Sequence, residues 1–389
     1  MFYPLANTTW DDAEYAALQE VIASDRFTMG PKVRAFEEAF AAKFGTRYAV
    51  MASSGSTANL LAMTAAFHHP DLGFRPGDEV IVPAVSWSTT YFPVTQNGLV
   101  LRFVDIDPQT LNIDPDRVAA AITPRTRMVF AVNLLGNPVE ADRLRAICKD
   151  AGILLAEDNC ESMGASLDGE MAGTFGLFGT FSTFFSHHIC TMEGGLVVTD
   201  DRKLYDNMLS IRAHGWVRDL PEDTHLPRDP DPFVRQFRFV LPGYNLRPIE
   251  MEGALGLPQL AKLDRLVAVR RENAKLFQQH FSDMPGVRIQ HETGESSWFG
   301  FAMVLEGAMA GRRRELVAAL TAAGIESRPV VTGNFLRNPV IDKLAHSVAG
   351  EVTAADAVDT DGLFVGNHHF PIPEQIAKLA EVVRGVTRS

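Results

Sequence analysis

Residues 153–161 read ILLAEDNCE, a short apolar run that ends in two adjacent carboxylates. Five further apolar runs resemble it, and helix-like segments separate them: YAVM (48–51), EVIVP (79–83), LRFVD (101–105), MVFAVN (128–133) and LVVT (196–199). Strands buried on both faces of a parallel sheet read as continuous apolar runs of this kind. The pattern predicts an α/β protein with a mostly parallel sheet, in which ligands bind at the carboxyl ends of the strands.

The C-terminal third has a different pattern. A charged helical run, LAKLDRLVAVRRENAKLFQQHF (260–281), is typical of a connecting helix. Beyond it, an apolar segment at 298–305, a helical segment at 313–323 and a C-terminal helix indicate a smaller α+β unit. We therefore expect a large domain at residues 1–260 and a small C-terminal domain at residues 261–389.

Composition excludes several classes of partner. The chain has 389 residues, 46% of them hydrophobic, and a formal net charge of −12, which repels nucleic acid and anionic membranes. Its three cysteines, Cys148, Cys160 and Cys190, are too few for a disulfide framework and show no zinc spacing. The N-terminus has no signal-peptide pattern, and no apolar run approaches the roughly 20 residues that span a bilayer. We expect a cytoplasmic protein with no metal, nucleic-acid or membrane partner.

Two motifs and a tryptophan suit a planar anionic ligand. The stretch SSGSTAN (53–59) lies between a strand and a helix, where backbone N–H groups bind phosphate, although a simple helix cap has the same composition. Asp158 ends its strand, where a carboxylate can pair with a cationic ring nitrogen. The alternative is an ordinary acidic loop at the end of a strand. Trp87 follows another strand and either stacks on a planar ligand or belongs to the core.

A third motif is FSTFFSHHICTMEGG (181–195), with two adjacent histidines. Neighbouring side chains point to different faces in a strand or a helix, so we expect His187 and His188 to have different roles. One suits a base, because the ordinary imidazole pKa of about 6.5 serves proton transfer in both directions. The alternative is a pair of structural histidines. The loop LPGYNLRP (241–248) adds an amide and a guanidinium, or is a plain surface turn.

Taken in order, these motifs resemble the sugar aminotransferases of pyridoxal 5′-phosphate (PLP) fold type I. The resemblance covers nearly the whole chain and rests on FTMG (27–30), SSGSTANLL (53–61), PAVSWSTTY (83–91), VNLLGNP (132–138), EDNCESMGA (157–165), SHHICTMEGG (186–195), RAHGW (212–216), LPGYNLRP (241–248), TGESSWFGF (293–301), RPVVTGNF (328–335) and GLFVGNHH (362–369). It implies an aspartate-aminotransferase-like large domain that binds the cofactor. In that family a lysine stands seven residues before the first glycine of the Gly-Gly pair, and here that residue is His187. A histidine at this place is similar to the deoxysugar 3-dehydratases.

The resemblance also implies roles for individual residues. Asp158 would pair with the ring nitrogen of PLP, Glu161 would contact its ring hydroxyl, and Trp87 would stack on the ring. The other residues implied to bind the cofactor are Gly55, Ser56, Ser182, Ser186 and Asn245. Asn245 would reach the phosphate from a neighbouring subunit, which implies a homodimer with shared sites. Glu326 and Arg328 would line the substrate pocket.

The implied reaction removes the C3 hydroxyl of a nucleotide-linked 4-keto-6-deoxyhexose, expected to be GDP-linked, in deoxysugar biosynthesis for lipopolysaccharide. PLP and its amine form (PMP) would be bound non-covalently, L-glutamate would donate the amine, His187 would transfer protons, and ammonia would be released. A nucleotide-sugar aminotransferase is the alternative, against which the missing lysine argues. A related iron–sulfur dehydratase needs four thiolate ligands, so we expect no cluster. A non-catalytic binding module is a third possibility, which turnover tests.

Overall fold

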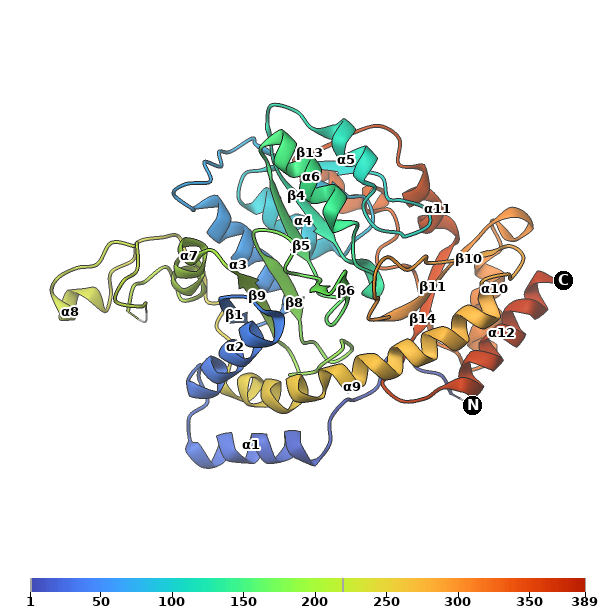
Figure 1. The fold of residues 1–389 in the computed structure, drawn as a ribbon, viewed down its shortest axis with the longest axis horizontal. Coiled ribbons are helices and arrows are strands. Elements are labelled where there is room, and N and C mark those ends of the chain that lie inside the picture. The colour runs from blue at the N-terminus through green and yellow to red at the C-terminus, as the bar shows by residue number, and fades with distance from the viewer. Residues whose placement is uncertain (1, 219, 389) are drawn as a thin grey trace.

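A computed structural model describes residues 2–218 and 220–388. Its larger part is built on an eight-stranded sheet (Figure 1). In spatial order the strands are β1 (Tyr48–Ala52), β9 (Gly195–Thr199), β8 (Gly179–Ser182), β5 (Leu154–Asp158), β4 (Thr126–Val132), β2 (Glu79–Pro83), β3 (Val100–Val104) and β13 (His346–Val348). Neighbours from β8 to β13 pair in parallel, and β9 runs antiparallel to both β8 and β1. The predicted mostly parallel sheet is confirmed.

Helices cover both faces of this sheet (Figure 1). They are α2 (Pro31–Phe44), α3 (Gly55–Phe67), α4 (Ser88–Gln96), α5 (Pro115–Ala121), α6 (Ala141–Ala151), α7 (Arg202–Arg212) and α9 (Glu250–Phe281). The helix α1 (Asp12–Ser24) packs on α9, outside this layer. Successive residues of β1 show the division: Val50 joins the core that contains residues of α3 and α7, and Met51 joins the core that contains residues of α2 and α9. Burial on both faces is why the strands read as unbroken apolar runs.

The smaller part is a four-stranded antiparallel sheet with helices on it. Its strands, in spatial order, are β10 (Val287–Ile289), β11 (Gly300–Leu305), β14 (Gly362–Gly366) and β12 (Ser327–Arg328). The C-terminal end of α9, together with α10 (Arg313–Ala322) and α12 (Pro373–Thr387), packs against this sheet in a second core. The helix α11 (Thr353–Asp361) contributes instead to the core of the large sheet. A short hairpin, β6 (Ser166–Leu167) and β7 (Glu170–Met171), completes the strands described. The predicted smaller α+β unit is confirmed.

The two parts are closely joined. The helix α9 runs without a break across the predicted boundary at residue 260, and begins earlier than the expected connecting helix. Each part also includes residues from the other part of the sequence. Tyr3, near the N-terminus, lies in the core of the small sheet, and β13, from the C-terminal third, pairs with β3 of the large sheet. The division into domains at residue 260 stays a prediction.

An arm formed by residues 214–218 and 220–245 projects away from the large sheet, with the short helix α8 (Pro232–Arg235) near its tip (Figure 1). Its aromatic side chains are unusually exposed, at 81% for Phe233 and 66% for Phe237. Arg218 lies over the rings of Trp216 and Phe237, 3.9 and 5.3 Å from their centroids. Apolar surface of this kind on an extended segment is typical of an interface with another chain.

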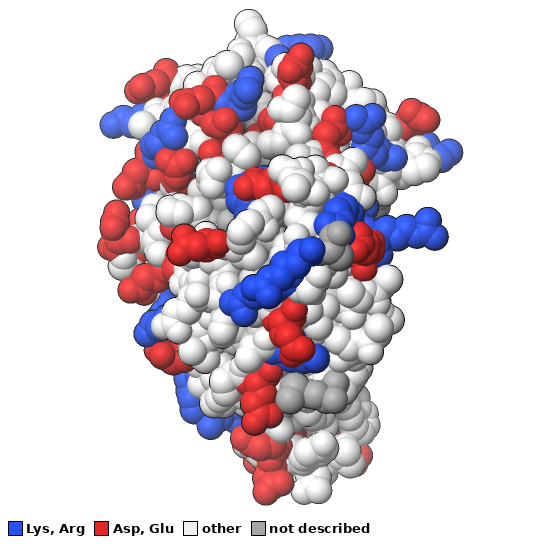
Figure 2. Space-filling view, turned by 90° about the vertical axis from the view of Figure 1, so that its right-hand side faces the viewer, with Lys and Arg blue, Asp and Glu red and all other residues white. Residues whose placement is uncertain are grey.

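Charged side chains of both signs lie on the surface of the protein. On the face shown in Figure 2, acidic and basic side chains are interspersed, and several basic side chains lie together near its centre. Across the described residues, no helix has the length and apolar character needed to cross a bilayer.

Candidate active site

The N-terminus of α3 forms a cradle beside β8. Ser54 caps the helix, and its side chain accepts a hydrogen bond from Thr57 N–H at 3.1 Å. A Cβ on Gly55 would lie only 2.6 Å from Cβ of Ser182, so glycine is required for this close approach. The Ser56 hydroxyl donates to Oγ1 of Thr89 at 3.0 Å, which adds α4 to the same place. Helix N–H groups and hydroxyls of this kind fit a phosphate group.

Asp158 lies at the carboxyl end of β5, buried and held by three hydrogen bonds. Its Oδ2 accepts from Asn59 at 2.8 Å and from Thr90 at 2.7 Å, and its Oδ1 accepts from Cys160 N–H at 3.1 Å. Asn59 belongs to the same helix as the cradle, and Thr90 belongs to α4. A carboxylate fixed in this way, a short distance along α3 from a phosphate cradle, fits the ring nitrogen of a pyridine phosphate.

Trp87 is the residue just before α4, and it is 56% exposed in the single chain. The alternative of a core tryptophan is therefore wrong. The chain runs on from Trp87 through Thr89 and Thr90, the residues that contact the cradle and Asp158. An exposed aromatic ring at this edge is placed to stack on a planar ligand.

The two histidines lie in different surroundings, as their adjacency predicts. His187 is in the turn after β8, where its N–H donates to Phe184 O at 2.9 Å, and its ring lies 5.2 Å from that of Phe299. Its Nδ1 is buried and has no hydrogen-bond partner among the described residues. His188 is fully buried, with Nε2 3.1 Å from Ser297 O. His187 is thus the member of the pair that is partly open to the site.

Burial lowers the pKa of His187 to about 4, against a smaller raising effect of hydrogen bonding to the Cys160 backbone, and the cationic Arg270 lowers it further. The ordinary value of about 6.5 expected from sequence is therefore wrong for this imidazole in the single chain. At neutral pH the ring is uncharged and able to accept a proton. An anionic ligand placed against it would favour the protonated form and move the pKa upward.

Glu161 follows in the loop after β5. Burial raises the pKa of its carboxyl group to about 7, and the neighbouring charge of Asp158 raises it further, although the Leu135 N–H bonded to Oε2 at 3.0 Å opposes this. A carboxyl group with this pKa exchanges a proton near neutral pH, which suits contact with a phenolic hydroxyl.

The remaining predicted residues are Ser186, Asn245, Glu326 and Arg328. Ser186 is half-buried in the turn that carries His187. Asn245 is exposed, and its Oδ1 accepts from Nε of Arg247 at 3.0 Å. Glu326 accepts from Leu5 N–H at 2.9 Å, and Arg328 lies exposed on β12. Within residues 2–218 and 220–388, no hydrogen bond joins Asn245, Glu326 or Arg328 to Asp158 or His187.

Four contributing residues were not predicted from sequence. They are Asn59, Thr89 and Thr90, whose hydrogen bonds link α3, α4 and Asp158, and Phe299, which contacts the histidines. The first three lie within the quoted motifs SSGSTAN and PAVSWSTTY. A polar side chain on an otherwise apolar helix face could have marked them as site residues. For Phe299 the sequence offered no comparable signal.

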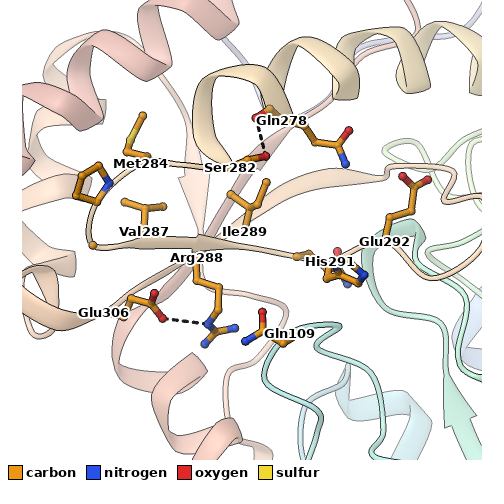
Figure 3. Close-up of a pocket in the computed structure, with 13 residues that line it drawn as sticks. Gln109, Gln278, Ser282, Met284, Val287, Arg288, Ile289, His291, Glu292 and Glu306 are labelled. Carbon is orange, nitrogen blue, oxygen red and sulfur yellow. Dashed lines mark hydrogen bonds and ion pairs between the residues drawn. The ribbon is translucent and has the colours of Figure 1, made fainter.

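A hollow of about 760 Å³ runs along β10, in the small four-stranded sheet (Figure 3). It is lined by polar and charged side chains, including Arg288, which pairs with Glu306 at 3.2 Å, and Gln109 from the loop opposite. None of the predicted site residues lines it. Nor does any group of three described His, Cys, Asp or Glu residues have a metal-binding arrangement.

Comparison with known proteins shows the family of the chain. The model of the DegT/DnrJ/EryC1/StrS aminotransferase family matches residues 8–384. The chain is 55% identical to GDP-4-keto-6-deoxy-D-mannose 3-dehydratase of Yersinia pseudotuberculosis, over 98% of both chains. Two solved structures of GDP-4-keto-6-deoxymannose-3-dehydratase, each 52% identical, superpose with TM-scores of 0.95 and 0.96 over 98% of this chain and 99% and 100% of theirs. The first holds a PLP-glutamate geminal diamine, and the second, a histidine-to-asparagine variant, holds GDP-perosamine.

Proposed function

Because the chain belongs to the DegT/DnrJ/EryC1/StrS aminotransferase family, we propose that it is a PLP-dependent enzyme that removes the C3 hydroxyl of GDP-4-keto-6-deoxy-D-mannose. L-Glutamate would be the amino donor and the source of two electrons. The products would be a GDP-linked 4-keto-3,6-dideoxy sugar, 2-oxoglutarate and ammonia. Identity of 55% to a dehydratase of this name, along the whole chain, supports the substrate and the reaction.

The observation that carries the proposal is His187. It stands where the transaminases of the family have lysine, in the turn that follows Ser182 of the cradle, and it is neutral at pH 7. An amine at this place would bind the cofactor covalently, and an imidazole acts as a proton carrier instead. A histidine therefore favours loss of the hydroxyl over transfer of the amine.

The described residues fit the cofactor. The cradle at Gly55, Ser56 and Ser182 would hold the phosphate, Asp158 would hold the ring nitrogen protonated, and Trp87 would cover the ring. When bound, the cofactor supplies an amine for the C4 ketone and a ring that accepts electrons. These contacts have to retain the cofactor without a covalent bond.

His187 would move the proton in this scheme. Its neutral ring takes a proton from carbon, and the imidazolium that results delivers a proton to the departing C3 oxygen. Its low pKa keeps the ring unprotonated before the first step. It also makes the ring a weaker base in that step and the imidazolium a stronger acid in the second. Phe299 packs against the ring, and the ring of Phe184 lies 6.3 Å away.

Exchange of each histidine tests this assignment. His187→Asn is expected to lower the rate of ammonia release by about 10²- to 10⁴-fold, the usual contribution of a general acid–base group. The matched His188→Asn is expected to cost less than about tenfold, because His188 is buried against Ser297 O and serves packing. Both variants should retain the cofactor after gel filtration, as their absorbance spectra would show. A large loss in His188→Asn with normal turnover in His187→Asn would assign the base to the other ring.

We propose further that two copies of the chain share their active sites. Asn245 is exposed beside the cradle, since the neighbouring Leu246 O accepts from Ser53 N–H at 3.0 Å. The exposed aromatic side chains of the arm that leads to Asn245 offer the apolar surface that a second chain would cover. Asn245 of a partner subunit would then complete the phosphate site, and L-glutamate and the GDP-sugar would bind between subunits.

Mixed dimers test the sharing of sites. His187→Asn and Asn245→Asp are each expected to be inactive alone, the latter because a carboxylate repels phosphate. When equal amounts are unfolded and refolded together, half of the dimers combine both chains and contain one intact site. About a quarter of the wild-type activity should return, measured as ammonia release. No recovery in a dimer whose refolding is verified with wild-type protein would place Asn245 and His187 in the same subunit's site.

A further inference from the structure

We infer that Phe299 is a positioning residue for His187, and that it acts from a turn anchored in the core of the small sheet. The inference rests on the proposed function, because it assigns a duty to the contact between Phe299 and the proposed base. Phe299 is half-buried, and its ring centroid lies 5.2 Å from that of His187 and 5.8 Å from that of His188. One phenyl ring therefore packs against both imidazoles.

Hydrogen bonds fix the backbone of Phe299 on both sides. Its N–H donates to Leu135 O at 3.0 Å, and its C=O accepts from Nη1 of Arg270 at 3.1 Å. Two residues earlier, Ser297 N–H donates to Gly136 O at 2.8 Å, while Ser297 O lies 3.1 Å from Nε2 of His188. The same short segment thus contacts both histidines and the loop that follows β4.

The turn itself has an unfavourable backbone conformation. Trp298 has φ of 48° and Leu135 has φ of 52°, both in the left-handed region that residues with a Cβ avoid. Such conformations persist only where the surroundings hold them, and they gather at functional sites. Gly136 shows how tightly the two segments meet, because a Cβ there would lie 2.4 Å from the backbone nitrogen of Trp298.

Because of the left-handed turn, the side chains of Trp298 and Phe299 point in different directions. Trp298 is buried in the core of the small sheet, 6.1 Å from the ring of Phe301, and its Nε1 donates to Glu292 at 3.3 Å. Phe299 points instead to the histidines and packs at the edge of the core of the large sheet. The position of the phenyl ring is therefore set by the small sheet, although the ring acts on a residue of the large one.

Arg270 of α9 completes the anchor. Its Nη1 also donates to Asn367 O at 2.7 Å, and Asn367 in turn donates through Nδ2 to Trp298 O at 2.9 Å and to Arg270 O at 3.0 Å. Arg270 and the backbone of Cys160 are the groups that act on the charge state of His187 besides burial itself. The turn is thus tied to the long helix and to the segment after β14.

Kinetics of three variants test the role. Phe299→Leu removes the ring, Phe299→Tyr keeps it, and Phe364→Leu removes a half-buried ring from the neighbouring strand β14 as a matched control. Phe299→Leu should lower kcat by about 10- to 100-fold, as misplacement of a reacting group does. KM for the GDP-sugar and cofactor content should stay unchanged. Phe299→Tyr should restore most of kcat, and Phe364→Leu should retain wild-type kcat.

A second measurement does not depend on turnover. In the full-length protein labelled with ¹³C-histidine, the signal of His187 is identified by its absence in His187→Asn. In the wild type its pKa should lie below the ordinary value of about 6.5, and in Phe299→Leu it should lie closer to that value, because water reaches the ring. An unchanged titration, or a kcat loss shared equally by Phe364→Leu, would overturn the inference. The pKa of His187 could differ as expected between the wild type and Phe299→Leu while the wild-type protein releases no ammonia. That result would contradict the proposed function alone.

Discussion

Replacement of His187 by lysine is expected to abolish dehydration and to bind the cofactor covalently. Lysine at this place reaches the cofactor aldehyde, whereas imidazole forms no such bond. Borohydride reduction followed by mass spectrometry should find a cofactor adduct at residue 187 of the variant. Release of ammonia should fall by about 10²- to 10⁴-fold, because an amine with an intrinsic pKa of about 10.4 is protonated and a poor free base at neutral pH.

The wild type and His187→Asn are the controls for this experiment. Neither should form an adduct with any lysine, although both should bind the cofactor through the cradle, Asp158 and Trp87. An adduct in the wild-type protein, or ammonia release at the wild-type rate by His187→Lys, would show that His187 does not stand at the reacting carbon.

Asp158→Asn is expected to have the second largest effect. The amide keeps the shape of the carboxylate that Asn59 and Thr90 hold, but it loses the charge that keeps the ring nitrogen protonated. Loss of one preorganised electrostatic group costs on the order of 10²- to 10³-fold in kcat. Steady-state ammonia release, with cofactor affinity from absorbance titration, measures both consequences.

Glu157→Gln is the matched control, since Glu157 precedes Asp158 on β5 and is also buried. Its carboxylate accepts from Gly173 N–H at 2.8 Å and from Phe175 N–H, and burial raises its pKa to about 7. A neutral side chain there resembles a form already present at neutral pH, so kcat should change little. If Asp158→Asn binds the cofactor and turns over as Glu157→Gln does, Asp158 has only a structural role.

The sequence predicted the central strands well, because burial on both faces leaves a local signal. All six predicted apolar runs coincide with strands of the large sheet, β1 to β5 and β9. No predicted run corresponds to β8 (Gly179–Ser182), and none corresponds to the edge strand β13. Its three residues, His346–Val348, are short and largely exposed, and their partner β3 lies far away in the chain, so neither periodicity nor propensity marks them.

The site was predicted less completely than the fold. Gly55, Ser56, Asp158 and Ser182 come together through local motifs at strand ends, which sequence shows directly. The contact of Phe299 with His187 joins distant segments through a left-handed turn at Trp298, a residue type that gives no sign of that conformation. The low pKa of His187 likewise depends on burial by residues from other elements, which no motif records.

The central claim is that this chain removes an oxygen from its sugar and does not transfer an amine to it. The direct test is mass spectrometry of the nucleotide sugar after incubation of the wild-type protein with PLP, L-glutamate and GDP-4-keto-6-deoxy-D-mannose. The account predicts a product lighter by one oxygen atom, with one ammonia and one 2-oxoglutarate released for each sugar. A product that keeps its C3 oxygen and carries a nitrogen at C4 would identify an aminotransferase and contradict it.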